Sequence, residues 1–200
     1  MTLPATNIGL WGMGLMSLND AQKSILLNLA RASINHGLLT SQPLSVDLNT
    51  YETALTNKAA SFVTLERQGQ LRGCIGMLEA QRPLVQDIAE NAFAAAFRDP
   101  RFPPLSTAEF SELDLHISIL SAAEAMSFNS EQDLIAQLKP AIDGLILQEG
   151  SRRGTFLPSV WEQLPEPRQF LRHLKQKAGL PAEYWSDKIK AYRYNTETFS

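Results

Sequence analysis

The segment from residue 113 to residue 120 alternates apolar and mostly polar side chains. The apolar side chains that share one face of an extended strand are those of Leu113, Leu115, Ile117 and Ile119. The polar side chains Asp114, His116 and Ser118 share the other face. One face of this strand therefore covers a core and the other is accessible, which is typical of antiparallel sheets.

Two further regions have the pattern of antiparallel hairpins. Residues 62–65 and 71–78 flank a turn at 67–70, and residues 145–147 and 154–157 flank Glu149-Gly150-Ser151. The tail 188–199 is expected to be a last strand, and the main helices are expected at about 18–36, 83–98 and 166–178. Shorter helices are expected to start at Ser106, Ser130 and Pro158. Helices mixed with hairpins predict an α+β fold, with a mixed, mainly antiparallel sheet and flanking helices.

The N-terminal region has few structural signals before residue 16. Ser17 and Asp20 have the spacing of a helix N-cap and its partner, and Gly37 is placed to stop that helix after His36. Residues 1–15 are expected to be a leader or a disordered segment. We expect residues 16–200 to form a single domain of two closely packed subdomains.

Composition argues against several kinds of protein and site. The net charge of -3 argues against binding nucleic acid through overall charge. One cysteine and three histidines without ligand spacing predict no disulfide, no metal site and no cofactor. The apolar stretch 8–16 is too short to cross a bilayer and lacks a basic start, so the cytoplasm is the expected compartment.

Cys74 is the first candidate for chemistry. In an extended strand Arg72, Cys74 and Gly76 share one face, with Arg72 and Cys74 about 6.6 Å apart along the chain. The Arg72 guanidinium could lean over the sulfur and favour the thiolate, while Gly73 and Gly76 would let a ligand approach the backbone. The alternative is structural, because cysteines are often buried as small apolar residues and strand glycines often mark close packing.

Two other features could complete a site. If the strand 113–120 lies beside 71–78, His116 could act as a base for Cys74, with Ser118 nearby; otherwise His116 only faces solvent. The loop 99–104 contains three prolines, and its stiffness could present Asp99 and Arg101 to a substrate. The alternative is that Asp99 is a cap and Arg101 a surface residue.

Several motifs in order resemble one known family. The segment Leu71-Arg72-Gly73-Cys74-Ile75-Gly76 resembles the signature of the AMMECR domain family. The other segments that resemble this family's motifs in register are 62–65, 95–105, 117–120, 155–161 and 177–180. Met77 and Ala122 are modest departures, since threonine and proline are frequent at these places in the family.

The resemblance implies a larger and a smaller subdomain with the signature near a groove between them. It assigns no activity, and it implies a possible Memo-type partner protein and a radical SAM enzyme, since related genes are often found together. The first hypothesis is an enzyme or enzyme subunit that binds a small anionic or nucleotide-like substrate through Arg72, Cys74, Asp99 and Arg101. The alternative is a non-catalytic interaction module for the Memo-type partner, in which Cys74 only packs.

Overall fold

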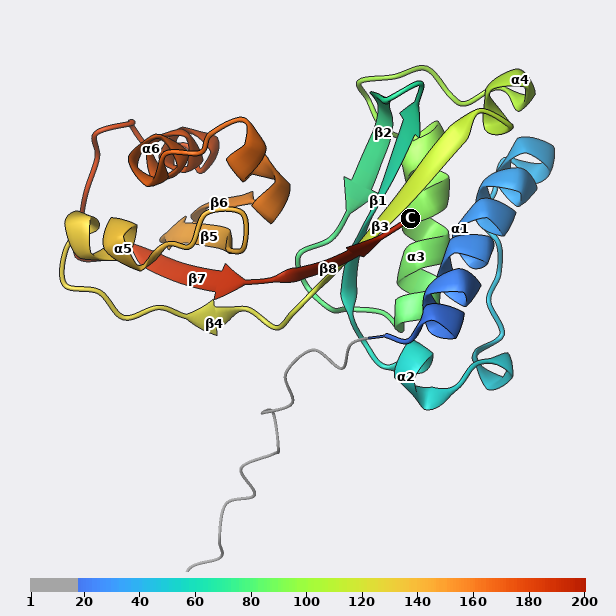
Figure 1. The fold of residues 1–200 in the computed structure, drawn as a ribbon, viewed down its shortest axis with the longest axis horizontal. Helices are drawn as coiled ribbons and strands as arrows, with labels where there is room; N and C mark the ends of the chain where they lie inside the picture. The colour runs from blue at the N-terminus through green and yellow to red at the C-terminus, as the bar shows by residue number, and fades with distance from the viewer. Residues whose placement is uncertain (1–17) are drawn as a thin grey trace, which may run out of the picture.

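A computed structural model describes residues 18–200, which form two lobes joined by extended chain (Figure 1). The first lobe contains α1 (Asp20–Thr40), a 3-10 turn (Leu48–Thr50), α2 (Thr53–Thr56), β1 (Ala60–Arg67), β2 (Gln70–Gly76), α3 (Leu84–Phe97), α4 (Thr107–Phe110), β3 (Leu113–Leu120) and β8 (Thr196–Phe199). The second lobe contains β4 (Glu124–Ala125), α5 (Glu131–Gln137), β5 (Gly144–Glu149), β6 (Arg152–Phe156), a 3-10 turn (Pro158–Glu162), α6 (Pro167–Lys177) and β7 (Lys190–Tyr194). The expectation for residues 1–15 and the cap at Ser17 lie outside the described residues.

The α+β class is confirmed, but the strands form two sheets rather than one mixed sheet. The strand orders are β2-β1-β3-β8 and β4-β7-β5-β6, and the strand pairings in both are antiparallel. The tail predicted as one strand divides at Asn195, because β7 joins the second sheet and β8 joins the first. Periodicity could not show this division, since both halves are extended.

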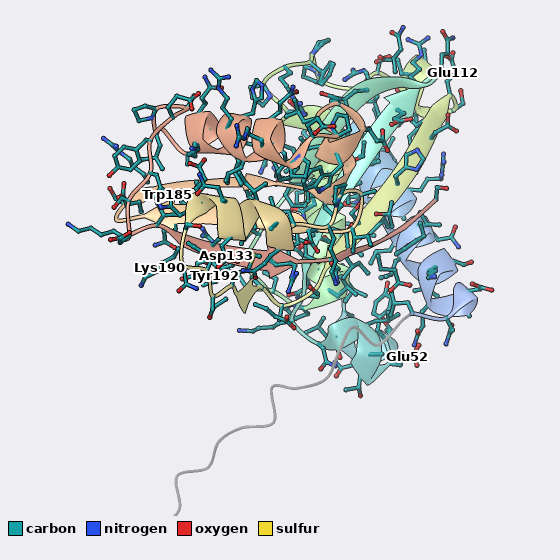
Figure 2. The ribbon with its side chains drawn as sticks, turned by 60° about the vertical axis from the view of Figure 1, so that its left-hand side comes forward. Glu52, Glu112, Asp133, Trp185, Lys190 and Tyr192 are labelled. Carbon is teal, nitrogen blue, oxygen red and sulfur yellow. The ribbon has the colours of Figure 1, made fainter. Side chains whose placement is uncertain are left out.

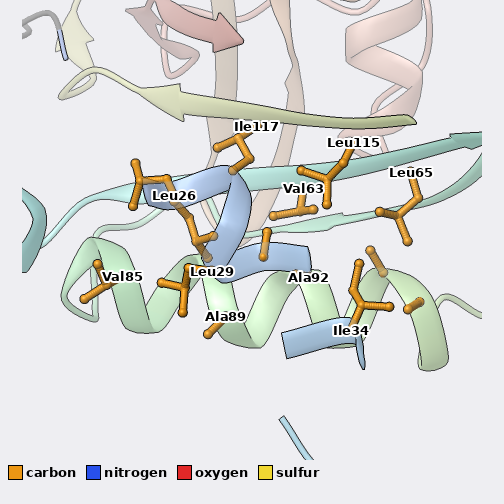
Figure 3. Packing of buried hydrophobic residues seen from close by; sticks show 14 of the residues in the cluster. Leu26, Leu29, Ile34, Val63, Leu65, Val85, Ala89, Ala92, Leu115 and Ile117 are labelled. Atoms are coloured by element: carbon orange, nitrogen blue, oxygen red, sulfur yellow. The ribbon is translucent and has the colours of Figure 1, made fainter. Parts of the chain in front are cut away.

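The core of the first lobe lies between one face of its sheet and the helices α1 and α3 (Figure 3). The odd-numbered residues Val63, Leu65, Leu115 and Ile117 are buried on this face, as the alternation of β3 predicts. Ala92, Ala95 and Ala96 of α3 are also buried, and their small side chains allow close packing. None of the described helices is long and apolar enough to cross a membrane.

Helix α1 differs from the prediction at both ends. Its N-cap is Asn19, which forms a capping box with Gln22. The helix continues through Gly37 to Thr40, so the predicted stop at Gly37 is wrong. A side chain at Gly37 would collide with the rings of α3, including that of Phe93, so this glycine allows two helices to approach.

The polar face of the first sheet is directed towards the second lobe (Figure 1). Ala60 and Leu120, at one end of this sheet, pack with Ile146 and Tyr194 of the second lobe. Beside this contact the two connecting segments are joined, because the Ser121 N–H donates to the Asn195 carbonyl oxygen over 2.9 Å. The lobes therefore meet at one end of the sheet face.

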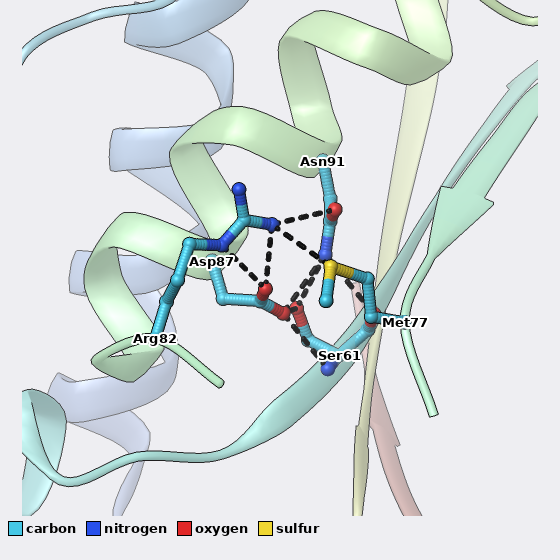
Figure 4. Close-up of polar contacts among 5 residues, drawn as sticks. All are labelled: Ser61, Met77, Arg82, Asp87 and Asn91. Carbon is cyan, nitrogen blue, oxygen red and sulfur yellow. Dashed lines mark hydrogen bonds and ion pairs between the residues drawn. The ribbon is translucent and has the colours of Figure 1, made fainter. Parts of the chain in front are cut away.

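A buried polar network fixes the start of α3 against the first sheet (Figure 4). One oxygen of the buried Asp87 accepts from the Ser61 N–H and hydroxyl and from the Asn91 amide, at 2.7–3.0 Å. Its other oxygen accepts from Arg82 at 2.8 Å. Each carboxylate oxygen has donors, so this buried charge is compensated.

Candidate functional site

Cys74, Thr64 and His116 form a row across three strands on the polar face of the first sheet. Thr64 is paired with Cys74 of β2 on one side and with His116 of β3 on the other. Cys74 is partly exposed, and the Thr64 hydroxyl lies 3.3 Å from its sulfur and donates to it. The condition on which His116 could act as a base for Cys74 is not met, because β1 lies between β2 and β3. His116 is thus two strand spacings, about 9.5 Å, from Cys74, too far for a direct Cys–His pair.

The next row on the same face contains Ser118. Phe62 is paired with Gly76 on one side and with Ser118 on the other. The Ser118 hydroxyl lies 2.9 Å from that of Thr198, so it is hydrogen-bonded within the sheet. A side chain at Gly76 would collide with Phe62, which gives this glycine a packing role.

Asp99 and Arg101 protect the outer edge of β2 at Cys74. In an antiparallel ladder, backbone groups of successive residues point to opposite sides, and those of Cys74 point away from β1. Its N–H donates to the Asp99 carboxylate over 2.9 Å, and its carbonyl oxygen accepts from Arg101 over 3.3 Å. The structure thus places both residues of the proline-rich loop beside Cys74, where they satisfy an exposed sheet edge.

The ion pair of Asp99 and Arg101 also sets the charge beside the Cys74 thiol. Arg101 and Asp99 are 2.6 Å apart. Hydrogen bonds from Arg101, with those from two backbone N–H groups, hold the pKa of Asp99 well below its ordinary value despite its burial. The same contact raises the pKa of Arg101, whose side chain is still 53% exposed. An anion arriving from solvent can therefore reach this guanidinium.

Arg72 lies elsewhere than predicted. It occupies a bulge in β2, and its guanidinium donates to Glu109 over 2.8 Å and to the Pro103 carbonyl oxygen over 3.0 Å. Arg72 is only 8% exposed, and it lowers the pKa of Glu109 to about 2. The expected contact with the Cys74 sulfur is replaced by this ion pair, so Arg101 is the arginine that contacts Cys74 in the structure.

Gly73 faces away from the open side of the sheet. A side chain there would overlap the backbone carbonyl of Ala95 in α3. Gly73 is buried between strand and helix, where it permits the close approach of β2 and α3. The structure therefore gives Gly73 a packing role and places it on the opposite face from Cys74.

Two participants were missed by sequence reasoning. Thr64 could have been found from the register of the hairpin, which sets it opposite Cys74. Glu109 forms a capping box with Ser106, at the start of the short helix that the sequence predicts there. Its contact with Arg72 depends on the folding of the loop between them, and spacing gives no signal for that.

The second lobe contains a hollow that lies apart from this row. The described residues contain no group of three or more His, Cys, Asp or Glu side chains arranged to hold a metal ion. A hollow of about 650 Å³ in the second lobe is lined by Trp185, Lys190 and Tyr192, among others (Figure 2). None of the residues predicted as a site lines that hollow.

A family model described as AMMECR1 matches residues 27–199. The chain belongs to the AMMECR1 family. A protein of Methanothermobacter thermautotrophicus is 34% identical over 176 residues, which cover 87% of this chain and 91% of the relative. Protein MJ0810 of Methanocaldococcus jannaschii is 32% identical over 191 residues, covering 94% and 92%. A Thermotoga maritima protein is 39% identical over 150 residues, covering 74% and 81%.

The fold of this AMMECR1-family chain is also that of a solved structure. The crystal structure of uncharacterized protein PH0010 from Pyrococcus horikoshii superimposes with a TM-score of 0.82 at 32% identity. The match covers 90% of this chain and 92% of PH0010. The family resemblance read from the motifs is therefore confirmed, and these comparisons name no reaction.

Proposed function

We propose that this AMMECR1-family protein is an enzyme or enzyme subunit that binds a small anionic substrate over Cys74. The observation that carries the proposal is that the partly exposed Cys74 lies next to the half-exposed Arg101. Arg101 is held at the Cys74 carbonyl oxygen, so an anion paired with its guanidinium would lie near the sulfur. A nucleotide-like substrate satisfies this requirement through its phosphates.

The residues of the row have separate roles in this proposal. Cys74 is the nucleophile or covalent acceptor, and the Thr64 hydroxyl stabilises negative charge on its sulfur by donating to it. Arg101 binds the anion, and Asp99 holds Arg101 in place. His116 and Ser118 lie further along the face, where they would contact a larger substrate. Arg72 supports the loop through Glu109.

The rate of Cys74 alkylation by neutral iodoacetamide tests the thiol. The sulfur displaces iodide and forms a carbon–sulfur bond, and the chain has no second cysteine to complicate the signal. We expect labelling of the folded wild type and slower labelling of Thr64→Val, which keeps the shape but removes the donor. Ser118→Ala is the matched control, because it removes a hydroxyl from the same face one row away.

The alternative function gives a different result. If the face is an interaction module for a Memo-type partner, Cys74 only packs and needs no reactivity. A folded wild type that resists iodoacetamide until it is unfolded would reject the enzyme proposal and favour this alternative. Equal rates in the wild type and Thr64→Val would reject the role of the hydroxyl.

A further inference from the structure

Strand β8 covers only part of the outer edge of β3. The ladder between them runs from Leu120, opposite Thr196, to Ile117, opposite Phe199. Strand β3 continues beyond this ladder to Leu113, and no strand of the described chain pairs with that stretch on its outer side. Among the described residues, this stretch of the outer edge of β3 is therefore unpaired.

A hollow of about 440 Å³ lies along this unpaired edge. Leu27, Asn28 and Arg31 of α1 form one wall, and Glu66, Asp114 and His116 lie on the sheet side. Ser200, which follows β8, lies at one end. The hollow is thus in line with β8 and bounded by a helix, as a further length of strand would require.

The backbone of β3 is oriented to bind such a strand. The Leu113 carbonyl oxygen accepts from Arg31 of α1 over 3.1 Å, which shows that it points to the outer side. Ile117 is the end of the ladder with β8 on that side. Backbone groups two residues apart in a strand point the same way, so the N–H and carbonyl of Leu115 also point outward into the hollow.

The charges at the edge favour a basic occupant. Asp114 and Glu66 are directly opposite each other on neighbouring strands, on the polar face of the sheet. Glu66 also lies 3.6 Å from the His116 Nε2 atom, and Arg31, the cation on the helix wall, donates to a backbone carbonyl oxygen. Asp114 is in no ion pair among the described residues, so a cation placed beside it relieves the unfavourable contact between the two carboxylates. On the other face the apolar side chain of Leu27 lines the hollow. A segment with a basic residue next to an apolar residue is complementary to both faces.

We propose that this hollow binds an extended peptide segment of a partner protein, which adds to β3 as an antiparallel strand in line with β8. Its backbone pairs with Leu115, its apolar residue lies against Leu27, and its neighbouring Lys or Arg lies beside Asp114. Main-chain hydrogen bonds supply affinity in strand addition, and alternate side chains supply selectivity. This site is separate from the Cys74–Thr64 contact on which the proposed function depends.

Two blocked peptides test the proposal with the full chain. One has the sequence Ser-Val-Lys-Val-Ser and the other has Glu in place of Lys. Amide NMR of the ¹⁵N-labelled protein should show that the Lys peptide shifts the Leu115 amide saturably and slows its hydrogen exchange. The Glu peptide should bind more weakly. An unchanged Leu115 amide, or equal binding of the two peptides, would overturn the proposal.

Three variants separate strand addition from unspecific attraction. Asp114→Lys, at an exposed position, should weaken binding of the Lys peptide by about threefold or more and strengthen binding of the Glu peptide. Asn28→Trp should fill the hollow from the exposed side of α1 and abolish binding of both peptides. Glu162→Lys is the control, because it makes a similar charge change in the second lobe and should change neither affinity.

These variants also keep the two proposals distinguishable. Asn28 and Asp114 line the hollow beside His116, at the end of the row away from Cys74, so iodoacetamide labelling of Cys74 in both variants should match the wild type. Persistent peptide binding by Asn28→Trp would contradict the peptide site alone. The rate of Cys74 labelling in Thr64→Val tests only the proposed function and has no consequence for the peptide site.

Discussion

Replacing Gly73 by alanine tests the close contact between β2 and α3. The added Cβ would overlap the carbonyl oxygen of Ala95 and lie against its carbonyl carbon. Both are backbone atoms, so no side-chain rotation can relieve the overlap. The strand or the helix must move, and the hydrogen bonds of Cys74 to Asp99 and Arg101 restrain that end of β2.

The expected cost follows from the nature of this overlap. Overpacking a core usually costs about 1–3 kcal/mol, and we expect Gly73→Ala at the upper end, about 3 kcal/mol, since backbone must shift. For a chain of this size that loss lowers the melting temperature by roughly 6–12 °C. Urea unfolding followed by circular dichroism gives the free energy, and calorimetry gives the melting temperature.

Gly150→Ala is the matched control for this experiment. Gly150 has a φ of +58° and no atom within 4 Å of an added Cβ. Its replacement should therefore cost only the left-handed backbone penalty, about 1 kcal/mol. If Gly73→Ala cost no more than Gly150→Ala, β2 would be free to move away from α3, and the packing account of the signature glycine would be refuted.

Three further predictions concern stability. Ala96→Leu should cost about 1–3 kcal/mol in urea unfolding, because Ala96 is buried on the core face of α3; no loss would mean that this face has room. Glu109 has its pKa lowered to about 2, so its ion pair stabilises the fold above about pH 4.5 and this stability is lost as pH falls towards 2. In urea unfolding, Glu109→Gln should have a lower free energy of unfolding than the wild type at pH 7. This free energy should also fall less than that of the wild type between about pH 4.5 and pH 2. Parallel curves of free energy against pH for the two proteins would contradict the role of Glu109. Asp87→Ala should cost about 1–3 kcal/mol for each buried donor that it leaves without an acceptor, those of Ser61 and Asn91, and Asp87→Asn should cost less; equal stability of all three proteins would contradict the network.

Local patterns predicted the first lobe well. Three elements were predicted from the regular spacing of apolar residues that face a core. They are the alternating strand β3, the hairpin of β1 and β2, and the alanine-rich helix α3. Gly37 shows the limit of such reasoning. A glycine at a helix end and a glycine between two helices have the same letter, and only the rings of Phe93 and Phe97 distinguish them.

The arrangement of the candidate site residues follows from the sequence only in part. Cys74, Asp99 and Arg101 do meet, because the stiff loop after α3 returns along the edge of β2. The partner of Arg72 could not be read from spacing, since Glu109 is 37 residues away and reaches it through the fold of that loop. The order of strands was equally hidden, and it decides that Thr64 rather than His116 is the neighbour of the thiol.

The most direct test of an anion site at the thiol is the ratio of two alkylation rates. Iodoacetate is anionic and iodoacetamide is neutral, and dividing their rates at one pH cancels changes in the intrinsic reactivity of the sulfur. We predict a ratio for wild-type Cys74 above that of free cysteine, a ratio near free cysteine for Arg101→Ala, and an intermediate ratio for Arg101→Lys. Arg67→Ala, which removes an arginine from the end of β1, should keep the wild-type ratio. The same ratio in the wild type, Arg101→Ala and free cysteine would contradict the account.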